Sequence, residues 1–207
     1  MTPTWISKDG EPIDKKISIF GWLLVFSRGS AIIFFIFIGL ILKFVLRVFE
    51  KPLFGDRRPV TPYITVLVSR ISLRLLSIPV VRFGIPLQQP GAFVSNHTSW
   101  LDIFALNSGH MLYFVSKSEV AKWPGIGLLA KATGTLFIRR ESKEAVAQKK
   151  LFAQRIKMGH QLLFFPEGTS TDGMRVLRFK SALFQAFFEL GSNSQCYIQP
   201  VTVTYFA

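Results

Sequence analysis

The feature that most limits the fold is an almost wholly apolar stretch near the N-terminus, at residues 17–49. It is broken by Ser27-Arg28-Gly29-Ser30 and later by Lys43 and Arg47. As a helix, its uninterrupted part at 31–42 would be about 18 Å long, which is too short for the ~30 Å hydrocarbon core of a bilayer. Extension to residue 49 gives about 28 Å, but a spanning helix then requires Lys43 and Arg47 to snorkel to the headgroups. The alternatives are one spanning helix, an interfacial helical hairpin, or a buried helix of a soluble protein.

Basic residues accompany this segment at helical spacing. Lys43, Arg47 and Lys51 recur every four residues and therefore form one stripe on a helix, which suits an interfacial helix as well as a spanning one. A second helix with a basic edge is expected over 63–77, after a proline-containing linker at 57–62. If the first helix spans, the basic residues that follow it place the rest of the chain on the cytoplasmic side of the inner membrane.

The composition also favours a membrane. The chain has 25 Lys and Arg against 12 Asp and Glu, a formal charge of +13, which predicts a polyanionic partner: nucleic acid or an acidic membrane. A mean hydropathy of +0.35 and basic residues beside apolar faces disfavour a nucleic-acid-binding protein. The single cysteine, Cys196, excludes an intrachain disulfide and C-x-x-C metal chemistry.

Beyond residue 79 the pattern changes to short apolar runs that alternate with longer amphipathic segments. Strands are expected at 80–85, 92–95, 111–115, 135–138, 161–165 and 197–204, and helices at 100–107, 119–131, 143–157 and 181–190. Strands that are apolar on both faces and are joined through helices predict an α/β fold, with a mostly parallel sheet flanked by helices. We therefore expect an N-terminal membrane anchor at 1–58 and an α/β domain at 59–207.

Polar, ionisable residues follow two of the expected strands immediately. The strand at 92–95 opens into Asn-His-Thr-Ser-Trp-Leu-Asp at 96–102, and the strand at 161–165 opens into Pro-Glu-Gly-Thr-Ser at 166–170. Chemistry in parallel sheets gathers at the carboxyl ends of the strands, so both segments are candidates for a functional cleft.

In the first of these segments, His97 and Asp102 have the H-x4-D spacing of a base and its orienting carboxylate. A histidine can take a proton from a hydroxyl if a carboxylate holds its other ring nitrogen. The alternative is a capping box, Ser99-x-x-Asp102, in which Asp102 only closes the start of a helix. The two interpretations coexist if one Asp102 oxygen caps the helix while the other holds His97.

The second segment offers Glu167, which can receive a substrate hydroxyl or hold a cation, and Gly168, which lets backbone N–H groups approach a ligand. Its alternative is a tight turn with a salt-bridged glutamate. No metal site is predicted, because His97, His110 and His160 are too widely dispersed.

Four segments are distinctive and follow one another along the chain: 96–102, 134–140, 165–169 and 198–201. Together they resemble the four motifs of the glycerophospholipid acyltransferase family, typified by 1-acyl-glycerol-3-phosphate acyltransferase. The resemblance covers about residues 84–203, and a hydrophobic N-terminal anchor is also usual for the family.

The resemblance implies a reaction and a set of roles. His97 would be the general base on the hydroxyl of an acceptor lysolipid, with Asp102 as its orienting partner, and the hydroxyl would attack the thioester of acyl-CoA or acyl carrier protein directly. No cofactor is expected. Arg140 would hold an anionic headgroup, Glu167 and Gly168 would line the acceptor site, and Pro200 would help to shape it. The remaining residues expected in the acceptor site are Asn96, Ser99, Thr169, Ser170 and Lys180.

One position departs from the family pattern. In the phosphatidate-making branch the third motif usually continues as Gly-Thr-Arg, but this chain has Ser170 at the place of the arginine. Loss of a bidentate donor weakens the case for a phosphomonoester acceptor. The run Thr-Ser-Thr-Asp-Gly at 169–173 looks more like the bacterial branch that acylates lyso-ornithine lipid, and Asp172 could receive the amine of that headgroup.

A membrane-associated lysolipid O-acyltransferase therefore explains the anchor, the charge and the motifs together. The alternative from another class is a non-catalytic, basic membrane-binding scaffold with the same fold.

Overall fold

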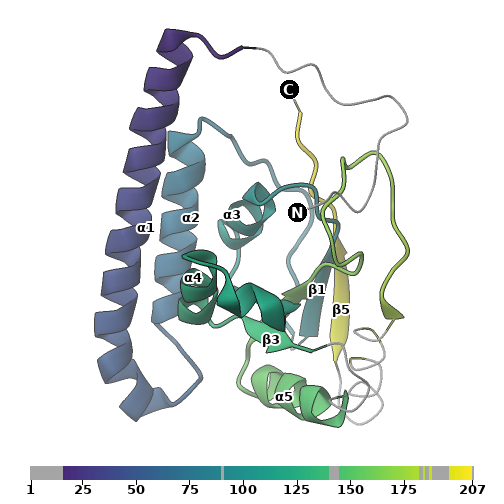
Figure 1. Cartoon of the computed structure of the whole chain (residues 1–207). Coiled ribbons are helices and arrows are strands. Elements are labelled where there is room, and N and C mark those ends of the chain that lie inside the picture. The colour runs from purple at the N-terminus through teal and green to yellow at the C-terminus, as the bar shows by residue number, and fades with distance from the viewer. Residues whose placement is uncertain are drawn as a thin grey trace.

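The computed structural model describes residues 16–89, 91–139, 145–181, 184, 187 and 196–206. Two long helices lie side by side along one flank of the molecule, and a sheet with shorter helices forms the rest (Figure 1). The helices are α1 (Ile19–Phe54), α2 (Thr61–Leu75), α3 (Leu101–Asn107), the 3-10 helix η1 (Ser118–Lys122), α4 (Ile126–Thr133) and α5 (Ala145–Lys157). The strands are β1 (Gly91–Ser95), β2 (Leu112–Lys117), β3 (Leu136–Ile138), β4 (Gln161–Phe164) and β5 (Tyr197–Val201).

The helix α1 is continuous through the polar residues at 27–30, and α2 returns along it to form a helical hairpin. The two helices approach closely at Gly39, where an added Cβ would lie 2.6 Å from Val68 Cγ2. Glu50 of α1 is buried and accepts hydrogen bonds from Val60 N at 2.7 Å and from Thr61 N at 3.0 Å. This carboxylate therefore ties the end of α1 to the beginning of α2.

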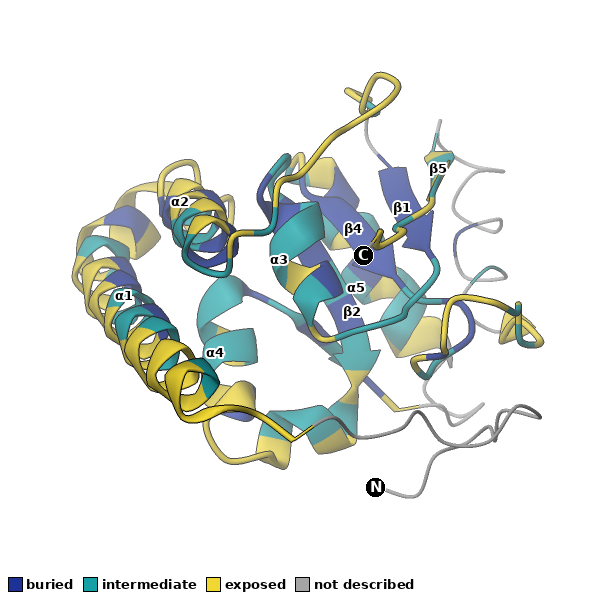
Figure 2. Cartoon of the chain, turned by 90° about the horizontal axis from the view of Figure 1, so that it is seen from above, coloured by how far each residue is buried: buried dark blue, intermediate teal, exposed yellow. Residues whose placement is uncertain are grey.

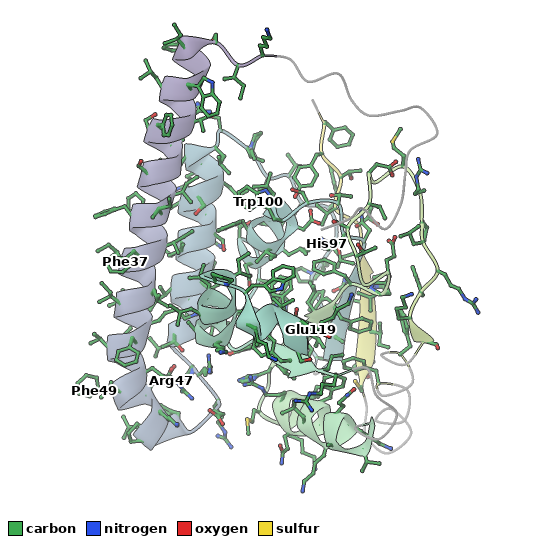
Figure 3. The ribbon with its side chains drawn as sticks, in the orientation of Figure 1. Phe37, Arg47, Phe49, His97, Trp100 and Glu119 are labelled. Atoms are coloured by element: carbon green, nitrogen blue, oxygen red, sulfur yellow. The ribbon has the colours of Figure 1, made fainter. Side chains whose placement is uncertain are left out.

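The outer face of α1 is apolar and exposed. Phe37 and Phe49 project away from the sheet, and they are 59% and 65% exposed (Figure 3). By length and composition α1 could cross a membrane, and only 11% of its most apolar window is buried. The alternative of a buried helix in a soluble protein does not fit so exposed a face.

The snorkelling that a spanning helix over 17–49 would require of Lys43 is not what the structure shows. Its side chain is 8% exposed, and Nζ donates to Thr65 Oγ1 of α2 at 2.5 Å. Lys43 therefore faces the neighbouring helix, because Gly39, one turn earlier, already brings this side of α1 against α2.

The sheet has the strand order β3-β2-β4-β1-β5, and every pairing is parallel, so the predicted α/β fold is confirmed. The buried strands lie between helices (Figure 2). On one face Phe152 and Ile156 of α5 pack against β1, β2 and β4, and on the other Leu106 of α3 packs against Phe93 and Leu163. Because β1 and β4 are neighbours, their two polar exits lie at the same edge of the sheet.

Two expected elements differ from the structure. Residues 80–85 form no strand: Pro79 and Pro86 lack N–H donors, and Gly84 has a φ of +89°, which interrupts an extended run. The helix expected at 119–131 is divided into η1 and α4, because the segment Trp-Pro-Gly at 123–125 turns the chain and Gly125 has a φ of +69°. The helix expected at 181–190 lies mostly outside the described residues.

Candidate active site

The two residues of the H-x4-D motif meet at the carboxyl end of β1. His97 Nδ1 lies 2.7 Å from Asp102 Oδ2. The Asp102 side chain is fully buried, and that of His97 is 21% exposed. His97 leaves the strand in a loop, while Asp102 lies in the first turn of α3, so the chain folds back across that turn and brings the two side chains together.

Asp102 is held by a dense set of donors. Oδ2 also accepts from Thr98 N at 2.7 Å and from Ser99 N at 3.0 Å, and Oδ1 accepts from Thr98 Oγ1 at 3.2 Å and from Tyr205 Oη at 2.6 Å. Burial opposes the charged carboxylate, but the hydrogen bonds from His97, Ser99 N, Tyr205 and Thr98 N outweigh it and lower the pKa of Asp102. Asp102 is therefore ionised at neutral pH.

The capping interaction and the contact with His97 do coexist, but not as expected. The same oxygen, Oδ2, receives both His97 Nδ1 and the backbone N–H of Ser99, while Oδ1 binds hydroxyl groups. The reason is geometric: the N–H groups of residues 98 and 99 point at the oxygen that faces the loop, which is also the side from which the His97 ring approaches.

The other ring nitrogen of His97 is uncommitted. Since the ionised Asp102 accepts at Nδ1, the neutral ring carries its proton on Nδ1 and a lone pair on Nε2. In the part of the chain that the structure describes, Nε2 has no hydrogen-bond partner. The ring stacks on Phe165, with centroids 4.0 Å apart and an angle of 11° between the planes. His97 is thus oriented on two sides, and its Nε2, which binds no described residue, is available to a substrate.

The segment after β4 lies directly beside this pair, as the sequence predicts for adjacent strand exits. Thr171 N donates to His97 O at 2.8 Å, and an added Cβ at Gly173 would lie 3.0 Å from Thr98 Cγ2. Gly168 has a φ of +72°, which turns the chain back toward the His97 loop. The two polar segments therefore form a single site.

Glu167 is buried, and its Oε2 accepts from Leu177 N at 3.0 Å. Lys180 N donates to Pro166 O at 2.8 Å, which ties residues 177–180 to the same turn, while the Lys180 side chain is exposed. Among the residues that the structure describes, Glu167 makes no salt bridge, so the alternative of a salt-bridged turn glutamate finds no support.

The other expected acceptor residues have different positions. Asn96 holds the loop to the C-terminal segment, because its Nδ2 donates to Val203 O at 2.9 Å and its Oδ1 accepts from Val203 N at 2.8 Å. Ser99 Oγ accepts from Leu101 N at 3.2 Å and so caps α3. Thr169 is half-buried and Ser170 is exposed. Arg140 lies outside the described residues.

Two aromatic residues at the site, Phe165 of the third motif and Tyr205, were given no role from the sequence. Phe165 could have been found, since the expected strand at 161–165 ends on it and in-register pairing of Val94 with Phe164 carries it to the His97 loop. Tyr205 follows β5, and nothing in the sequence says that β5 pairs with β1, so no local signal links Tyr205 to Asp102.

The His97–Asp102 pair lies at one edge of the parallel sheet. Nε2 of His97, which has no partner among the described residues, can accept the proton of a hydroxyl group. Residues 79–204 match the family model described as Acyltransferase, and the chain belongs to that family of enzymes. The resemblance that the four motifs indicated is thereby confirmed.

The chain is 51% identical to the lyso-ornithine lipid O-acyltransferase of Rhodobacter capsulatus over 205 residues, which cover 99% of this chain and 74% of that protein. It is 41% identical over 118 residues to the lyso-ornithine lipid O-acyltransferase of Pseudomonas aeruginosa (57% of this chain, 44% of that protein). It is 35% identical over 100 residues to the 1-acyl-sn-glycerol-3-phosphate acyltransferase of Neisseria gonorrhoeae (48% of this chain, 39% of that protein). Its aligned part thus spans less than half the length of the last two relatives.

A solved structure has the same fold. The crystal structure of the 1-acyl-sn-glycerophosphate acyltransferase PlsC from Thermotoga maritima superposes with a TM-score of 0.51 at 22% sequence identity, covering 79% of this chain and 72% of that one.

The hydrogen bond from Tyr205 leads to a prediction about stability. Tyr205→Phe removes one donor to a buried carboxylate, so we expect the free energy of unfolding at pH 7 to fall by about 1.5–3 kcal/mol. A depressed pKa stabilises the fold above the ordinary carboxyl pKa of about 4, and this contribution is lost as the pH falls through the folded pKa. Without the Tyr205 donor the folded pKa of Asp102 rises toward its unfolded value, so the pH-dependent part of the stability becomes smaller and its loss is complete at a higher pH. Chemical unfolding in detergent between pH 3 and 7 measures both effects.

The matched control is Tyr63→Phe, which removes a hydroxyl from an exposed position on α2. This variant should unfold like the wild type at every pH. An unfolding curve of Tyr205→Phe that coincides with that of Tyr63→Phe would contradict the assigned role.

Proposed function

We propose that this chain is a membrane-associated lysolipid O-acyltransferase that acylates lyso-ornithine lipid. The reaction is supported above all by the His97–Asp102 pair, with Nε2 of His97 directed to neither Asp102 nor another described residue. The acceptor is supported by the relatives named lyso-ornithine lipid O-acyltransferase, and by Ser170 in place of an arginine.

In the proposed mechanism the acceptor hydroxyl donates its proton to His97 Nε2 while its oxygen attacks the thioester carbonyl of acyl-CoA or acyl carrier protein. A carbon–oxygen bond forms and the carbon–sulfur bond breaks. The thiolate leaves and takes up the proton from the imidazolium. Asp102 keeps the ring in the required tautomer and stabilises its positive charge at a distance of 2.7 Å. No acyl-enzyme intermediate and no cofactor enter this scheme.

The acceptor headgroup carries a carboxylate and an ammonium. Asp172 is not the free anion suggested by the sequence, because Arg175 Nη2 lies 2.9 Å from its Oδ2. Glu167 is the better candidate for the ammonium: it is buried beside the site, and its Oε1 has no hydrogen bond to a described residue. Arg140 remains the proposed partner of the carboxylate.

Membrane association is supported by the exposed apolar face of α1 and by the charge of +13. Basic residues near an acidic bilayer contribute roughly 1 kcal/mol each to binding. We propose that the chain lies at the cytoplasmic face of the inner membrane, where acyl-CoA and acyl carrier protein are available as donors.

The test is the lysolipid-dependent release of free thiol from acyl-CoA or acyl carrier protein by the purified full chain. An acyltransferase releases thiol only when donor and acceptor are both present, whereas a membrane-binding scaffold releases none. Competition between lyso-ornithine lipid and lysophosphatidic acid in the same assay identifies the acceptor.

The acceptor proposal predicts the effect of Ser170→Arg. A phosphomonoester has close to two negative charges and is bound best by several guanidinium donors. Ser170 is exposed, so an arginine fits without repacking. Wild type should prefer lyso-ornithine lipid, and Ser170→Arg should shift the ratio of kcat/KM values toward lysophosphatidic acid by about 10- to 100-fold, the equivalent of one charge-assisted contact.

Ser170→Gln is the control, since it adds length and polarity without charge. It should keep the wild-type preference. If wild type prefers lysophosphatidic acid and neither substitution changes the ratio, another arginine, such as the exposed Arg178, fills the role and the acceptor proposal fails.

A further inference from the structure

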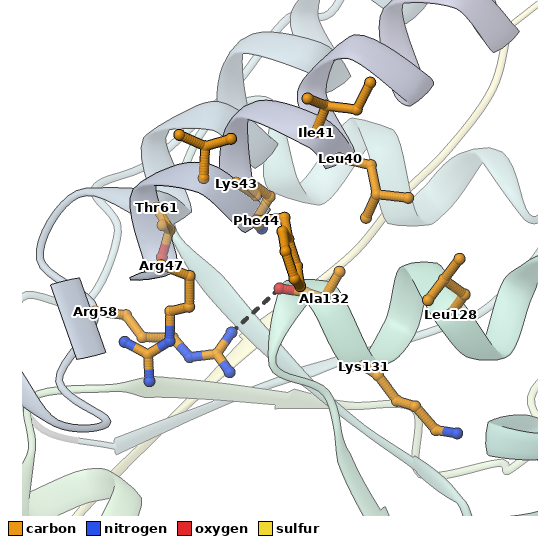
Figure 4. A pocket seen from close by; sticks show the side chains of 11 residues that line it. Leu40, Ile41, Lys43, Phe44, Arg47, Arg58, Thr61, Leu128, Lys131 and Ala132 are labelled. Carbon is orange, nitrogen blue, oxygen red and sulfur yellow. Dashed lines mark hydrogen bonds between the residues drawn. The ribbon is translucent and has the colours of Figure 1, made fainter. Parts of the chain in front are cut away.

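A groove of about 510 Å³ lies between the second half of α1 and the helix α4 (Figure 4). Its walls include the apolar side chains of Leu40, Phe44 and Leu128, and it also contains the cationic side chains of Lys43, Arg58 and Lys131. None of these residues belongs to the His97 site. The helices α2 and α3 lie between α1 and the end of β1 that carries His97 (Figures 1 and 2).

The positive charge of this groove is only partly compensated. Arg47, at its edge, pairs with Glu50 at 3.3 Å and with Asp56 at 2.7 Å. The other three cations form no ion pair with the residues that the structure describes: Lys43 donates to Thr65 Oγ1, Arg58 Nη1 donates to Ala132 O at 3.2 Å, and Lys131 is exposed. A ligand with a negative charge would therefore find three cations that make no direct ion pair with a described residue.

One N–H group of the Arg58 guanidinium lacks a hydrogen-bond acceptor among the described residues. Its Nε is buried without a hydrogen-bond partner in the described part of the molecule. A buried N–H group without an acceptor is destabilising. Burial and the neighbouring Arg47 also lower the pKa of Arg58, and the attraction of Asp56 and Glu50 offsets this only in part. An anionic oxygen at this end of the groove would stabilise the guanidinium.

The apolar wall determines what kind of anion fits. Lys43 lies between Leu40 and Phe44 along α1, and Lys131 lies three residues beyond Leu128 on α4, so each of these cations has an apolar side chain within about one helical turn. Phe44 and Leu128 are 75% and 60% exposed, and both belong to the outer apolar surface that the proposed membrane association would place against lipid. An amphiphile could therefore enter sideways from the bilayer, whereas a small soluble anion would leave the apolar wall in contact with water.

We propose that this groove binds one anionic phospholipid of the surrounding bilayer. The headgroup phosphate lies among Lys43, Arg58 and Lys131, and an acyl chain lies along Leu40, Phe44 and Leu128. This lipid is neither donor nor acceptor in the proposed reaction. It bridges α1 and α4, and so links the membrane hairpin to the α/β part of the molecule.

Native mass spectrometry of the full chain in detergent tests this site, with phosphatidylglycerol and phosphatidylcholine as the probes. Wild type should retain one phosphatidylglycerol and no phosphatidylcholine. The double variant Lys43→Met and Lys131→Met keeps side-chain length and removes two of the cations, so its dissociation constant for phosphatidylglycerol should rise by about tenfold or more. The control is Lys150→Met with Lys157→Met, which removes the same charge from exposed positions of α5 and should bind like wild type.

A second variant removes the groove without changing the charge. Ala132→Phe places a ring in the cavity, and it should lose the bound phosphatidylglycerol while its circular dichroism spectrum stays that of wild type. Equal retention by wild type, the double variant and Ala132→Phe would overturn the proposal. So would displacement of the lipid by an equimolar amount of inorganic phosphate, which would show a phosphate site instead. The thiol-release assay is independent: wild type that binds the lipid but releases no thiol contradicts the proposed reaction and leaves this site intact.

Discussion

His97→Ala is expected to lower turnover by at least about 100-fold while the protein remains folded and bound to membranes. Loss of a general base typically costs a factor of 10²–10⁴. The ring of His97 is partly exposed and stacks on Phe165, and it belongs to neither cluster of the buried core, so its removal should leave the core packing unchanged. The measurement is thiol release at saturating donor and acceptor, with the unfolding midpoint measured in parallel.

His110→Ala is the comparison for this variant. His110 precedes β2 and contacts Gln161 and the ring of Phe93, so it belongs to the packing of the sheet and not to the His97–Asp102 site. It should lower stability more than His97→Ala and turnover much less. Near-normal turnover of a folded His97→Ala protein would remove His97 from the mechanism.

The fold was predictable where the signal was local. The run Ala-Phe-Val at 92–94 is apolar on both faces, and the structure buries it in the middle of a parallel sheet. The helical state of α1 and α2 followed from apolar periodicity with basic edges, whereas a hairpin was only one of the alternatives left open. Residues 80–85 show the limit of this reasoning: Val81 and Phe83 have the composition of a strand, but they are 73% and 95% exposed, because no neighbouring strand pairs with them.

The predictable part of the site consists of residues whose side chains are reactive and which follow an expected strand directly in the sequence. The histidine, the aspartate and the turn at Glu167 stand directly after strands, and parallel topology alone brings such exits to one edge. Tyr205 could not be found in this way. Its contact with Asp102 spans 103 positions in the sequence and depends on β5 lying beside β1, which is a matter of strand order. The contact of Lys43 with α2 could not be found for a similar reason, since only the packing of α2 decides which side of α1 is covered.

Asp102→Asn should lower turnover by about 10²–10⁴-fold and leave the structure intact. An asparagine can place its amide oxygen at the position of Oδ2, where it still accepts from Thr98 N and Ser99 N, and its amide nitrogen at the position of Oδ1. There it donates to the hydroxyl groups of Thr98 and Tyr205, which can both accept. The hydrogen bonds are kept, and what is lost is the negative charge beside the imidazolium.

Asp102→Ala removes both the negative charge and the hydrogen-bond acceptor, whereas Asp102→Asn removes only the charge. It leaves the N–H groups of Thr98 and Ser99 without their acceptor in a buried turn, so it should destabilise the fold by about 2–4 kcal/mol in addition to lowering turnover. The double variant His97→Ala with Asp102→Asn completes the test. If Asp102 acts only through His97, the second substitution should add almost nothing to the first, because residues that act as a unit are not additive. Additive losses in the double variant would mean that Asp102 contributes to catalysis by a route that does not pass through the histidine.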